Sequence, residues 1–329
     1  MNVTCLQNLP APPTDKTGWP WTIESIPVPD TMPDGNCWPK VSIVTPSYNQ
    51  GRFLEETIRS VLLQSYHNLE YIIMDGGSTD TSKDIIKKYE RWISSWVSEK
   101  DKGQAHAINR GFRQATGDIF AWLNSDDVLL PQAVYLAVSY LHEHSDAGMV
   151  YSDRDIIDAE SKVIGERLLR KFVSWQFRYC SGVNQETGFW RKKIYFECGE
   201  LDESLHFGMD FDLWLRIIQK ADIHHIPAKL GMYRAHGQSR SVMVDRIQKT
   251  SDEKVKRMAQ EAATIRRRYF GRETTGIEKM ILPRLHNIVG HLEEKFGKYN
   301  SKKRFVEQKL EELKKASTGD IESIKKYIF

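Results

Sequence analysis

The stretch Ile119-Phe120-Ala121-Trp122-Leu123-Asn124-Ser125-Asp126-Asp127 is the most informative for the fold, because an unbroken apolar run is followed, after two polar residues, by two adjacent carboxylates. Such a run predicts a buried strand, and the acidic pair then stands at its carboxyl end. Neighbouring carboxylates repel each other, so a sheet edge holds both most easily when a cation shares their charge. Oxygen ligands of this kind suit Mn²⁺ or Mg²⁺, which take further ligands from phosphates and water. Alternatively, the acids cap the helix that Pro131 is predicted to open.

Strands and helices alternate on both sides of this stretch. Apolar runs predict further strands at 41–45, 69–74, 96–98 and 149–152, and apolar residues at helical spacing lie between most of them. The expected fold is therefore α/β, with a mainly parallel sheet between helices. In such folds ligands bind beyond the carboxyl ends of the strands.

The chain divides into four predicted regions. Residues 1–39 are rich in proline and predict an irregular arm, and residues 40–150 hold the alternating strands and helices. In residues 151–248 the alternation weakens, a hairpin is predicted around 159–162, and a helix is predicted to begin near Gly208. Residues 249–329 predict amphipathic helices, the first with a capping box formed by Thr250 and Glu253.

The composition is that of an ordinary folded protein. Of the 329 residues, 40% are apolar and 28% are charged, so disorder is not expected. The cysteines at 5, 37, 180 and 198 form no C-x-x-C pair, which argues against a zinc ribbon or a thioredoxin-like motif. No apolar run approaches the roughly 20 residues that cross a bilayer, and the first residues lack a secretion-signal pattern. A cytoplasmic location is therefore expected.

The C-terminal region is basic. Residues 251–329 hold 19 Lys and Arg against 12 Asp and Glu, whereas the preceding residues hold 28 against 32, so the net charge of +3 hides an asymmetry. Glu residues are interspersed at helical spacing, which favours a solvated helical face. Peripheral contact with the inner face of a membrane is the alternative hypothesis, and no nucleic-acid partner is expected. The apolar faces of these helices predict packing on the body or on a partner subunit.

Polar residues also follow the other predicted strands. The first strand ends in Thr45-Pro46-Ser47-Tyr48-Asn49, whose tyrosine could stack on a nucleobase. The second ends in Asp75-Gly76-Gly77-Ser78-Thr79-Asp80, where glycines leave room for a flat ligand. Asp75 could accept hydrogen bonds from a base or ribose, or could merely stabilise the turn. Acids and amides in 99–104 are expected at the same edge.

Residues 40–241 resemble the family 2 glycosyltransferases, which have the GT-A fold. The resemblance rests on the motif that begins at Val41, on Asp75–Asp80, on Asp101–Gly103 with Ala107–Gly111, and on Trp122–Asp127. It implies inverting transfer of a sugar from a nucleotide diphosphate donor, such as a UDP-sugar, to a saccharide or lipid-linked acceptor. It also implies that 40–150 bind the donor, while 151–248 bind the acceptor and carry the catalytic base.

The same resemblance suggests roles for individual residues. The donor would be bound by Pro46, Tyr48, Asp75, Asp101, Gln104 and Asp126, and the Mn²⁺ or Mg²⁺ by Asp127, Asp126 and His236. Gln185, Trp190 and Arg191 would lie on the acceptor side, although Trp190 could instead be a core residue. Asn124 stands where the family often has Asp, so Asn124 is a weaker ligand candidate than either acid.

The catalytic base is expected in Gly208-Met209-Asp210-Phe211-Asp212-Leu213-Trp214. Met209 stands where the family usually has Glu, but Asp210 keeps the position of the proton acceptor. Without the resemblance, Asp210 and Asp212 would be interpreted as first-turn acids that the helix dipole favours.

Missing motifs argue against other nucleotide-binding enzymes. The G-x-G-x-x-G of a dehydrogenase and the G-x-x-x-x-G-K-[ST] of a P-loop NTPase are absent. Residues 47–51 do not form the glycine-rich phosphate loop that a nucleotidyltransferase needs. The remaining alternative is a noncatalytic module that binds a nucleotide sugar or a glycan, for which Met209 is the only sign.

Overall fold

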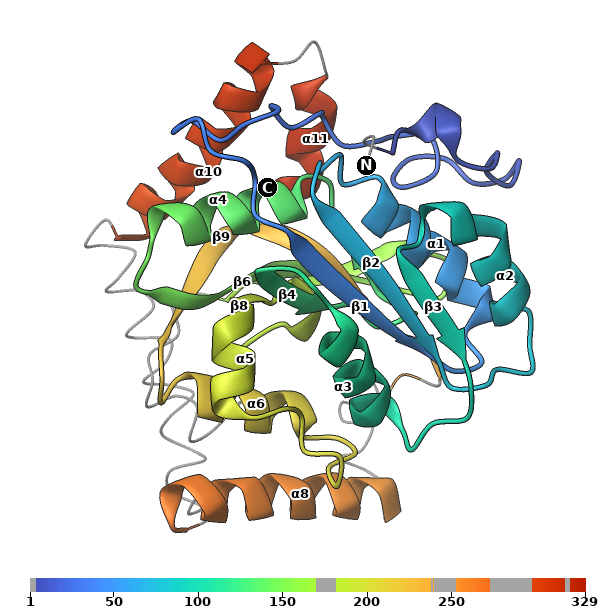
Figure 1. Ribbon diagram of the computed structural model, residues 1–329, viewed down its shortest axis with the longest axis vertical. Coiled ribbons are helices and arrows are strands. Elements are labelled where there is room, and N and C mark those ends of the chain that lie inside the picture. The colour runs from blue at the N-terminus through green and yellow to red at the C-terminus, as the bar shows by residue number, and fades with distance from the viewer. Residues whose placement is uncertain (1–3, 170–181, 238, 240–252, 273–297, 317–319) are drawn as a thin grey trace.

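A mixed sheet runs through the molecule, and helices cover both of its faces (Figure 1). The computed structural model describes residues 4–169, 182–237, 239, 253–272, 298–316 and 320–329. The strand order is β3-β2-β1-β4-β8-β6-β9-β5, with β7 paired to β6. The strands are β1 (Val41–Ser47), β2 (Leu69–Asp75), β3 (Ser95–Ser98), β4 (Ile119–Trp122), β5 (Val128–Leu129), β6 (Ala147–Ile157), β7 (Val163–Arg167), β8 (Phe189–Arg191) and β9 (Asp222–Arg234).

The half of the sheet from β3 to β4 is parallel. β1 pairs with β2 and β4, and β2 pairs with β3, all in the parallel sense. The register sets Ser47 beside Asp75 and Asp75 beside Ser98, so these strands end at one edge of the sheet. The predicted parallel arrangement is confirmed for this half.

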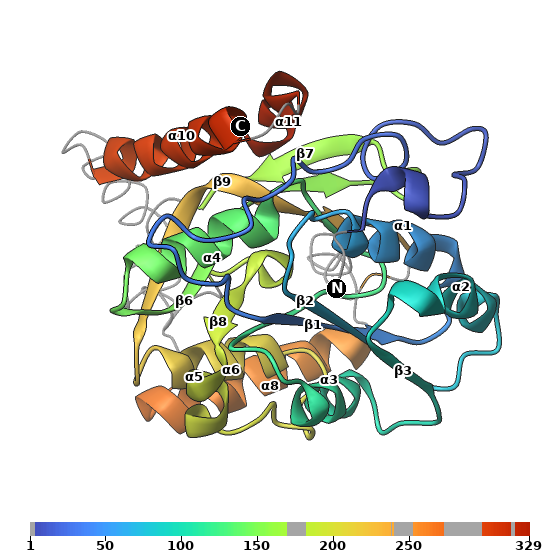
Figure 2. The same cartoon turned by 45° about the horizontal axis from the view of Figure 1, so that its top comes forward.

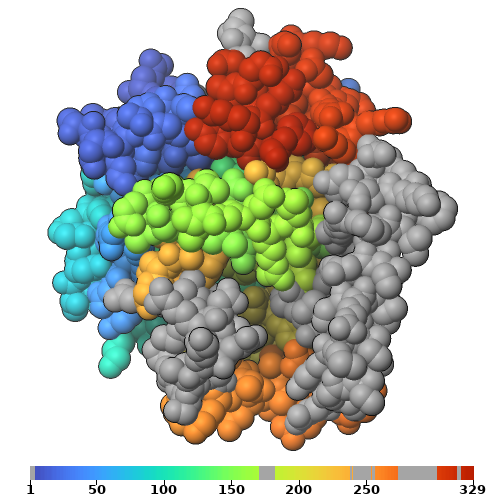
Figure 3. Space-filling view, turned by 180° about the vertical axis from the view of Figure 1, so that it is seen from behind, coloured from blue at the N-terminus to red at the C-terminus, as the bar shows by residue number. Residues whose placement is uncertain are grey.

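The other half of the sheet is mixed, so the expectation of a mainly parallel sheet does not extend to it. β8 runs antiparallel to both β4 and β6, and β5 runs antiparallel to β9, while β6 and β9 are parallel. The hairpin predicted around 159–162 is confirmed as the antiparallel pair of β6 and β7. This hairpin lies at the surface seen in Figure 3, and Val163 and Ile164 of β7 are exposed.

Apolar side chains fill both faces of the sheet. Along β1, Val41 and Ile43 belong to one core cluster and Val44 to the other, as the alternation of a strand requires. The helices that pack on the sheet or on each other are α1 (Gly51–Leu62), α2 (Ser82–Tyr89), α3 (Gln104–Gln114), α4 (Ala133–Glu143), α5 (Lys192–Cys198), α6 (Met209–Ile217), α8 (Glu253–Phe270), α10 (Lys298–Ala316) and α11 (Ile321–Ile328).

The acidic pair does not cap a helix. β5 lies between Asp127 and α4, and α4 begins at Ala133 rather than at Pro131. Gln132 has a φ of 64°, so the chain turns sharply just before the helix. The capping interpretation of Asp126 and Asp127 is therefore wrong.

The two ends of the chain pack on the body. The irregular arm is anchored by Trp19, whose indole N–H donates to the carbonyl of Leu129 over 2.7 Å. Leu310, Leu313 and Ile324 of α10 and α11 are buried in the core, which confirms the expected packing of the C-terminal helices. Figures 1 and 2 show these helices at the opposite end of the molecule from α8.

Among the described residues, no helix combines the length and the apolar character that a bilayer span requires. The predicted capping residue Thr250 lies outside the described residues, although α8 does begin at Glu253.

Candidate active site

The carboxyl ends of β1, β2 and β4 open onto one cavity of about 760 Å³. The structure therefore brings the segments after these strands together, as the alternation of strands and helices predicts. The cavity also receives the start of α3 and the start of α6. The predicted site residues that line it are Pro46, Tyr48, Asp101, Gln104, Asp126, Asp127, Gln185 and Asp210.

Asp127 is held in an almost fully buried position on the cavity wall. Its carboxylate accepts hydrogen bonds from the backbone N–H of Arg234 at 2.9 Å and from the Asn124 amide at 3.1 Å. Burial raises the pKa of this carboxyl well above its ordinary value, and the negative charges of Asp126 and Glu186 act in the same direction. The site therefore concentrates negative charge where little water can screen it.

Asn124 organises the acidic pair through its side-chain amide. The amide donates to Asp127 and to Oε1 of Gln185, while its oxygen accepts a 2.6 Å hydrogen bond from Gln104. A carboxylate at this position could not donate to Asp127 and would add another negative charge. The departure from the family pattern at Asn124 thus suits the local hydrogen bonds.

The acidic pair and His236 are residue types that bind divalent cations. Asp126 and Asp127 offer carboxylate oxygens at the cavity, and His236 lies 3.0 Å from Oδ2 of Asp126 through its Nε2. The His236 ring also packs against Phe53, with 4.6 Å between the ring centroids. Carboxylates and an imidazole form a donor set that suits Mn²⁺, and the carboxylates alone suit Mg²⁺.

Asp75 does not line the cavity, in contrast to its predicted role at the donor. Its carboxylate accepts hydrogen bonds from the backbone of Gly77 and Ser78 and from the hydroxyls of Ser78 and Ser98. The turn-stabilising alternative describes this residue, because the bonds from its own loop and from Ser98 of β3 engage both carboxylate oxygens.

The loop that Asp75 stabilises forms part of the cavity wall. Gly76 and Gly77 line the cavity, and a Cβ on Gly76 would lie only 2.7 Å from Oδ2 of Asp101. Glycine at this position therefore permits the close approach of Asp101. Tyr48 stands nearby with 62% of its surface exposed.

Asp210 is the second residue of α6 and is partly exposed at the cavity wall. Burial raises the pKa of its carboxyl above the ordinary value, and the charge of Glu186 contributes in the same direction. A raised pKa suits a carboxylate whose task is to take up a proton. Met209, which replaces the usual Glu, is buried with the second core cluster.

Comparison with known proteins decides the family of the central region. Residues 42–199 match the model of "Glycosyl transferase family 2". These residues form a glycosyl transferase family 2 domain. An uncharacterized glycosyltransferase of Nostoc is 35% identical over 130 residues, which are 39% of this chain and 40% of the relative. The matched part thus spans less than half the length of that relative. An uncharacterized glycosyltransferase of Haemophilus influenzae is 25% identical over 68% of this chain and 73% of its own.

Two solved structures share the fold of most of this chain. The mannosyltransferase PcManGT from Pyrobaculum calidifontis, in complex with GDP-Man and Mn²⁺, has a TM-score of 0.55 at 18% identity, covering 87% of this chain and 77% of its own. TarS of S. aureus, residues 1–349 in complex with UDP-GlcNAc, has a TM-score of 0.53 at 16% identity, covering 73% of this chain and 75% of its own. The predicted GT-A fold is confirmed by these likenesses.

On the predicted acceptor side, the family 2 domain places Gln185 at the cavity but not Trp190 or Arg191. Trp190 is fully buried and packs edge-on against Trp122, with ring centroids 5.2 Å apart. Arg191 donates to the carbonyls of Leu141 and Ala147. The acceptor-side prediction is therefore wrong for Arg191, and for Trp190 the core alternative is the one observed, because both residues lie in β8, a strand inside the sheet.

Glu186 and Arg154 are charged residues of the cavity wall that were not among the predicted site residues. Glu186 is buried and pairs with Arg154 of β6 at 3.1 Å, and the Arg154 guanidinium lies 4.5 Å from the centre of the Tyr233 ring. All three line the cavity. Glu186 directly follows the predicted Gln185 in the chain, and that adjacency was the available signal.

Arg234 was also not predicted as a site residue, although it stands two residues before His236. Its side chain is fully buried and donates to the carbonyl of Asp126 over 2.8 Å. It also forms a 2.8 Å ion pair with Glu56 of α1. Arg234 thus ties the acidic pair to the first helix of the domain.

Proposed function

We propose that the protein is an inverting, metal-dependent glycosyltransferase that moves a sugar from a nucleoside diphosphate donor, a UDP-sugar, to a saccharide or lipid-linked acceptor. One observation carries the proposal: Asp126 and Asp127 share a cavity of about 760 Å³ with Asp210. A cavity of this size can hold a nucleotide sugar and part of an acceptor. The family 2 domain supports the reaction class.

The donor nucleotide fits the part of the cavity around Tyr48, Asp101 and the glycines after β2. The exposed Tyr48 ring offers a face on which a base can stack. Asp101 accepts a 2.8 Å hydrogen bond from Gly103, which leaves further lone pairs for a ribose hydroxyl or a base N–H. Gly76 and Gly77 bring only backbone to this wall, so a flat ligand can approach closely.

Asp126, Asp127 and His236 would hold the Mn²⁺ or Mg²⁺. When bound, the ion would offset the negative charge that develops on the departing diphosphate. Arg234 and Asn124 hold Asp127 in place through the hydrogen bonds described above.

Asp210 would act as the general base. Its carboxylate takes the proton from an acceptor hydroxyl as that oxygen forms a bond to the anomeric carbon. The bond from this carbon to the diphosphate breaks at the opposite side, so the configuration inverts and a nucleoside diphosphate leaves. General-base catalysis of this kind contributes about 10²- to 10⁴-fold in rate.

The proposed function is tested by turnover of UDP-glucose and UDP-N-acetylglucosamine in the presence of Mn²⁺ or Mg²⁺. We expect slow hydrolysis without an acceptor, loss of this activity on chelation, and its abolition in Asp127→Ala. Glu160→Ala, which changes an exposed acid of the β6–β7 turn outside the cavity, is the control. Undiminished turnover in Asp127→Ala would refute the metal assignment.

The basic C-terminal helices would contribute at most an electrostatic membrane contact. The apolar residues Leu310, Leu313 and Ile324 face the core, so they are not available for insertion. We propose binding to vesicles that contain phosphatidylserine at low salt, with release at high salt. Absence of binding at every salt concentration would rule out this contact.

A further inference from the structure

α8 lies outside the residues that match the family model, yet one of its faces contacts the segment that carries Asp210. The contacting residues Arg257, Glu261, Ile265 and Arg268 recur every three or four positions, so they form one stripe on the helix. Figure 1 shows α8 running below α6. Residues of this stripe contact Asp202, the turn at 206–208 and Asp212.

Glu261 holds the turn from which α6 starts. Its Oε2 accepts three backbone hydrogen bonds, from His206 at 3.0 Å, Phe207 at 2.8 Å and Gly208 at 3.3 Å. His206 and Phe207 line the cavity themselves. A single carboxylate oxygen thus fixes both a piece of the cavity wall and the N-terminus of the helix that carries Asp210.

The next turn of α8 packs directly on this helix start. Ile265 is fully buried, and a Cβ on Gly208 would lie 2.6 Å from its Cδ1. The approach is therefore so close that only glycine fits without movement. Arg257, one turn before Glu261, donates to the ring of His206 over 2.8 Å.

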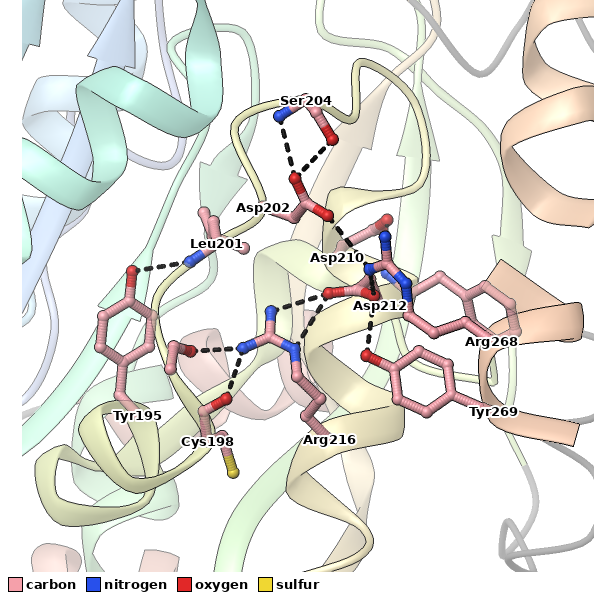
Figure 4. Close-up of polar contacts among 12 residues, drawn as sticks. Tyr195, Cys198, Leu201, Asp202, Ser204, Asp210, Asp212, Arg216, Arg268 and Tyr269 are labelled. Atoms are coloured by element: carbon pink, nitrogen blue, oxygen red, sulfur yellow. Dashed lines mark hydrogen bonds and ion pairs between the residues drawn. The ribbon is translucent and has the colours of Figure 1, made fainter. Parts of the chain in front are cut away.

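The last turn of α8 binds Asp212, which lies two residues after the proposed base (Figure 4). Arg268 and the Tyr269 hydroxyl each contact Oδ1 of Asp212 at 2.9 Å, and Arg216 of α6 contacts Oδ2 at 3.0 Å. Asp212 is almost fully buried. The first turn of α6 is thus held at both ends by side chains of α8.

We propose that α8 is a positioning element for the general base and that Glu261 is its principal positioning residue. This inference rests on the proposed function, because it gives Asp210 the role of base. Small displacements of a catalytic group cost large factors in rate, about 10²-fold for 1 Å. Without Glu261, three backbone N–H groups at 206–208 lose their acceptor and Asp210 loses its fixed place.

The test compares Glu261→Ala, Glu261→Gln and the control Gln260→Ala, which changes the neighbouring exposed residue of the same helix. The readouts are kcat for turnover of whichever UDP-sugar the wild type uses, the Kd for UDP with Mn²⁺, and the melting temperature. In Glu261→Ala we expect kcat to fall by about 10- to 100-fold, with the Kd for UDP within twofold of the wild type. Glu261→Gln keeps an oxygen acceptor and should recover most of the loss, and Gln260→Ala should match the wild type.

Unchanged kcat in a folded Glu261→Ala variant would overturn the proposal, and so would a parallel loss of UDP binding, which indicates general damage. If Glu261→Ala does not melt cooperatively, Tyr269→Phe replaces it, because that change removes one of several contacts to Asp212. In Tyr269→Phe, a severalfold lower kcat at an unchanged Kd for UDP supports the proposal, and an unchanged kcat refutes it. Wild-type protein without turnover, or Asp210→Asn with full turnover, would instead refute the proposed function itself.

Discussion

Arg234 and Glu56 form an ion pair of 2.8 Å in which both side chains are buried, 0% and 6% exposed. The same arginine donates from its backbone N–H to the Asp127 carboxylate and from Nε to the carbonyl of Asp126, so the pair links α1 to both acids. Glu56→Ala would leave a buried guanidinium without its counter-charge. We expect the free energy of unfolding in urea to fall by about 3–5 kcal/mol.

The matched control for Glu56→Ala is Glu160→Ala. Glu160 pairs with Arg52 at 2.7 Å, but both side chains are largely exposed. Solvent screens this pair, so its loss should change the free energy of unfolding by less than about 1 kcal/mol. Equal losses of unfolding free energy in the two variants would show that burial does not make the Arg234–Glu56 pair more stabilising than the exposed pair.

Asp210→Asn should lose transfer but gain stability at neutral pH. Because burial raises the pKa of Asp210, the folded protein retains this proton at a pH where the unfolded chain has released it. Stability is therefore lost as the pH rises through the raised pKa. The amide removes this loss, so we expect the variant to melt at a higher temperature than the wild type at pH 7, and no such advantage below about pH 3.9.

The activity of the wild type should also depend on the ionisation of Asp210, but it should rise with pH where stability falls. A base must be ionised, so wild-type kcat should fall as the pH is lowered through the raised pKa of Asp210. Binding of UDP should persist in Asp210→Asn, since Asp210 lies outside the part of the cavity that we propose for the donor. A variant that neither melts higher at pH 7 nor loses transfer would contradict both expectations.

Tyr48→Ala should weaken UDP binding without affecting stability. The ring is largely exposed, so little packing is lost. Stacking of a base on an aromatic side chain is worth about 1–3 kcal/mol, which calorimetry with UDP and Mn²⁺ would measure. Tyr48→Phe keeps the ring face and should bind UDP almost as well as the wild type. Equal losses in both variants would assign the effect to the hydroxyl.

Gly208→Ala and Ile265→Val should be coupled. The φ of Gly208 is −106°, which alanine adopts readily, so the strain in Gly208→Ala comes from the contact with Cδ1 of Ile265. We expect about 1–2 kcal/mol of destabilisation. Ile265→Val removes that methyl group, so the double variant should lose less stability than the sum of the single losses. Strict additivity would mean that the two residues do not touch.

Local patterns predicted which strand ends line the cavity. The strand ends after β1, β2 and β4 meet because parallel strands share an edge, and that consequence of alternation needs no knowledge of distant contacts. Tyr48, Asp101, Gln104 and the acidic pair therefore lie at the cavity as expected. The family motif likewise placed Asp210 there.

The differences from the predictions concern side chains whose contacts the pattern of strands and helices does not specify. Asp75 stands at the correct edge, but the hydroxyl of Ser98 and its own loop take up its carboxylate. Trp190 belongs to a motif near the cavity, but β8 carries it into the sheet. The stripe on α8 gave no local signal, because Glu261 contacts backbone groups more than 50 residues away.

The arm before β1 has a practical consequence for protein engineering. Arg59 of α1 is fully buried and donates to the carbonyls of Pro10, Pro20 and Trp21 at 2.8–3.1 Å. A shortened protein that starts where the family match starts would lose these three acceptors and keep only the Tyr89 hydroxyl, which lies 3.1 Å from Nη1 of Arg59. Removal of the arm up to the start of the family match should therefore yield insoluble protein, and expression trials should retain the arm.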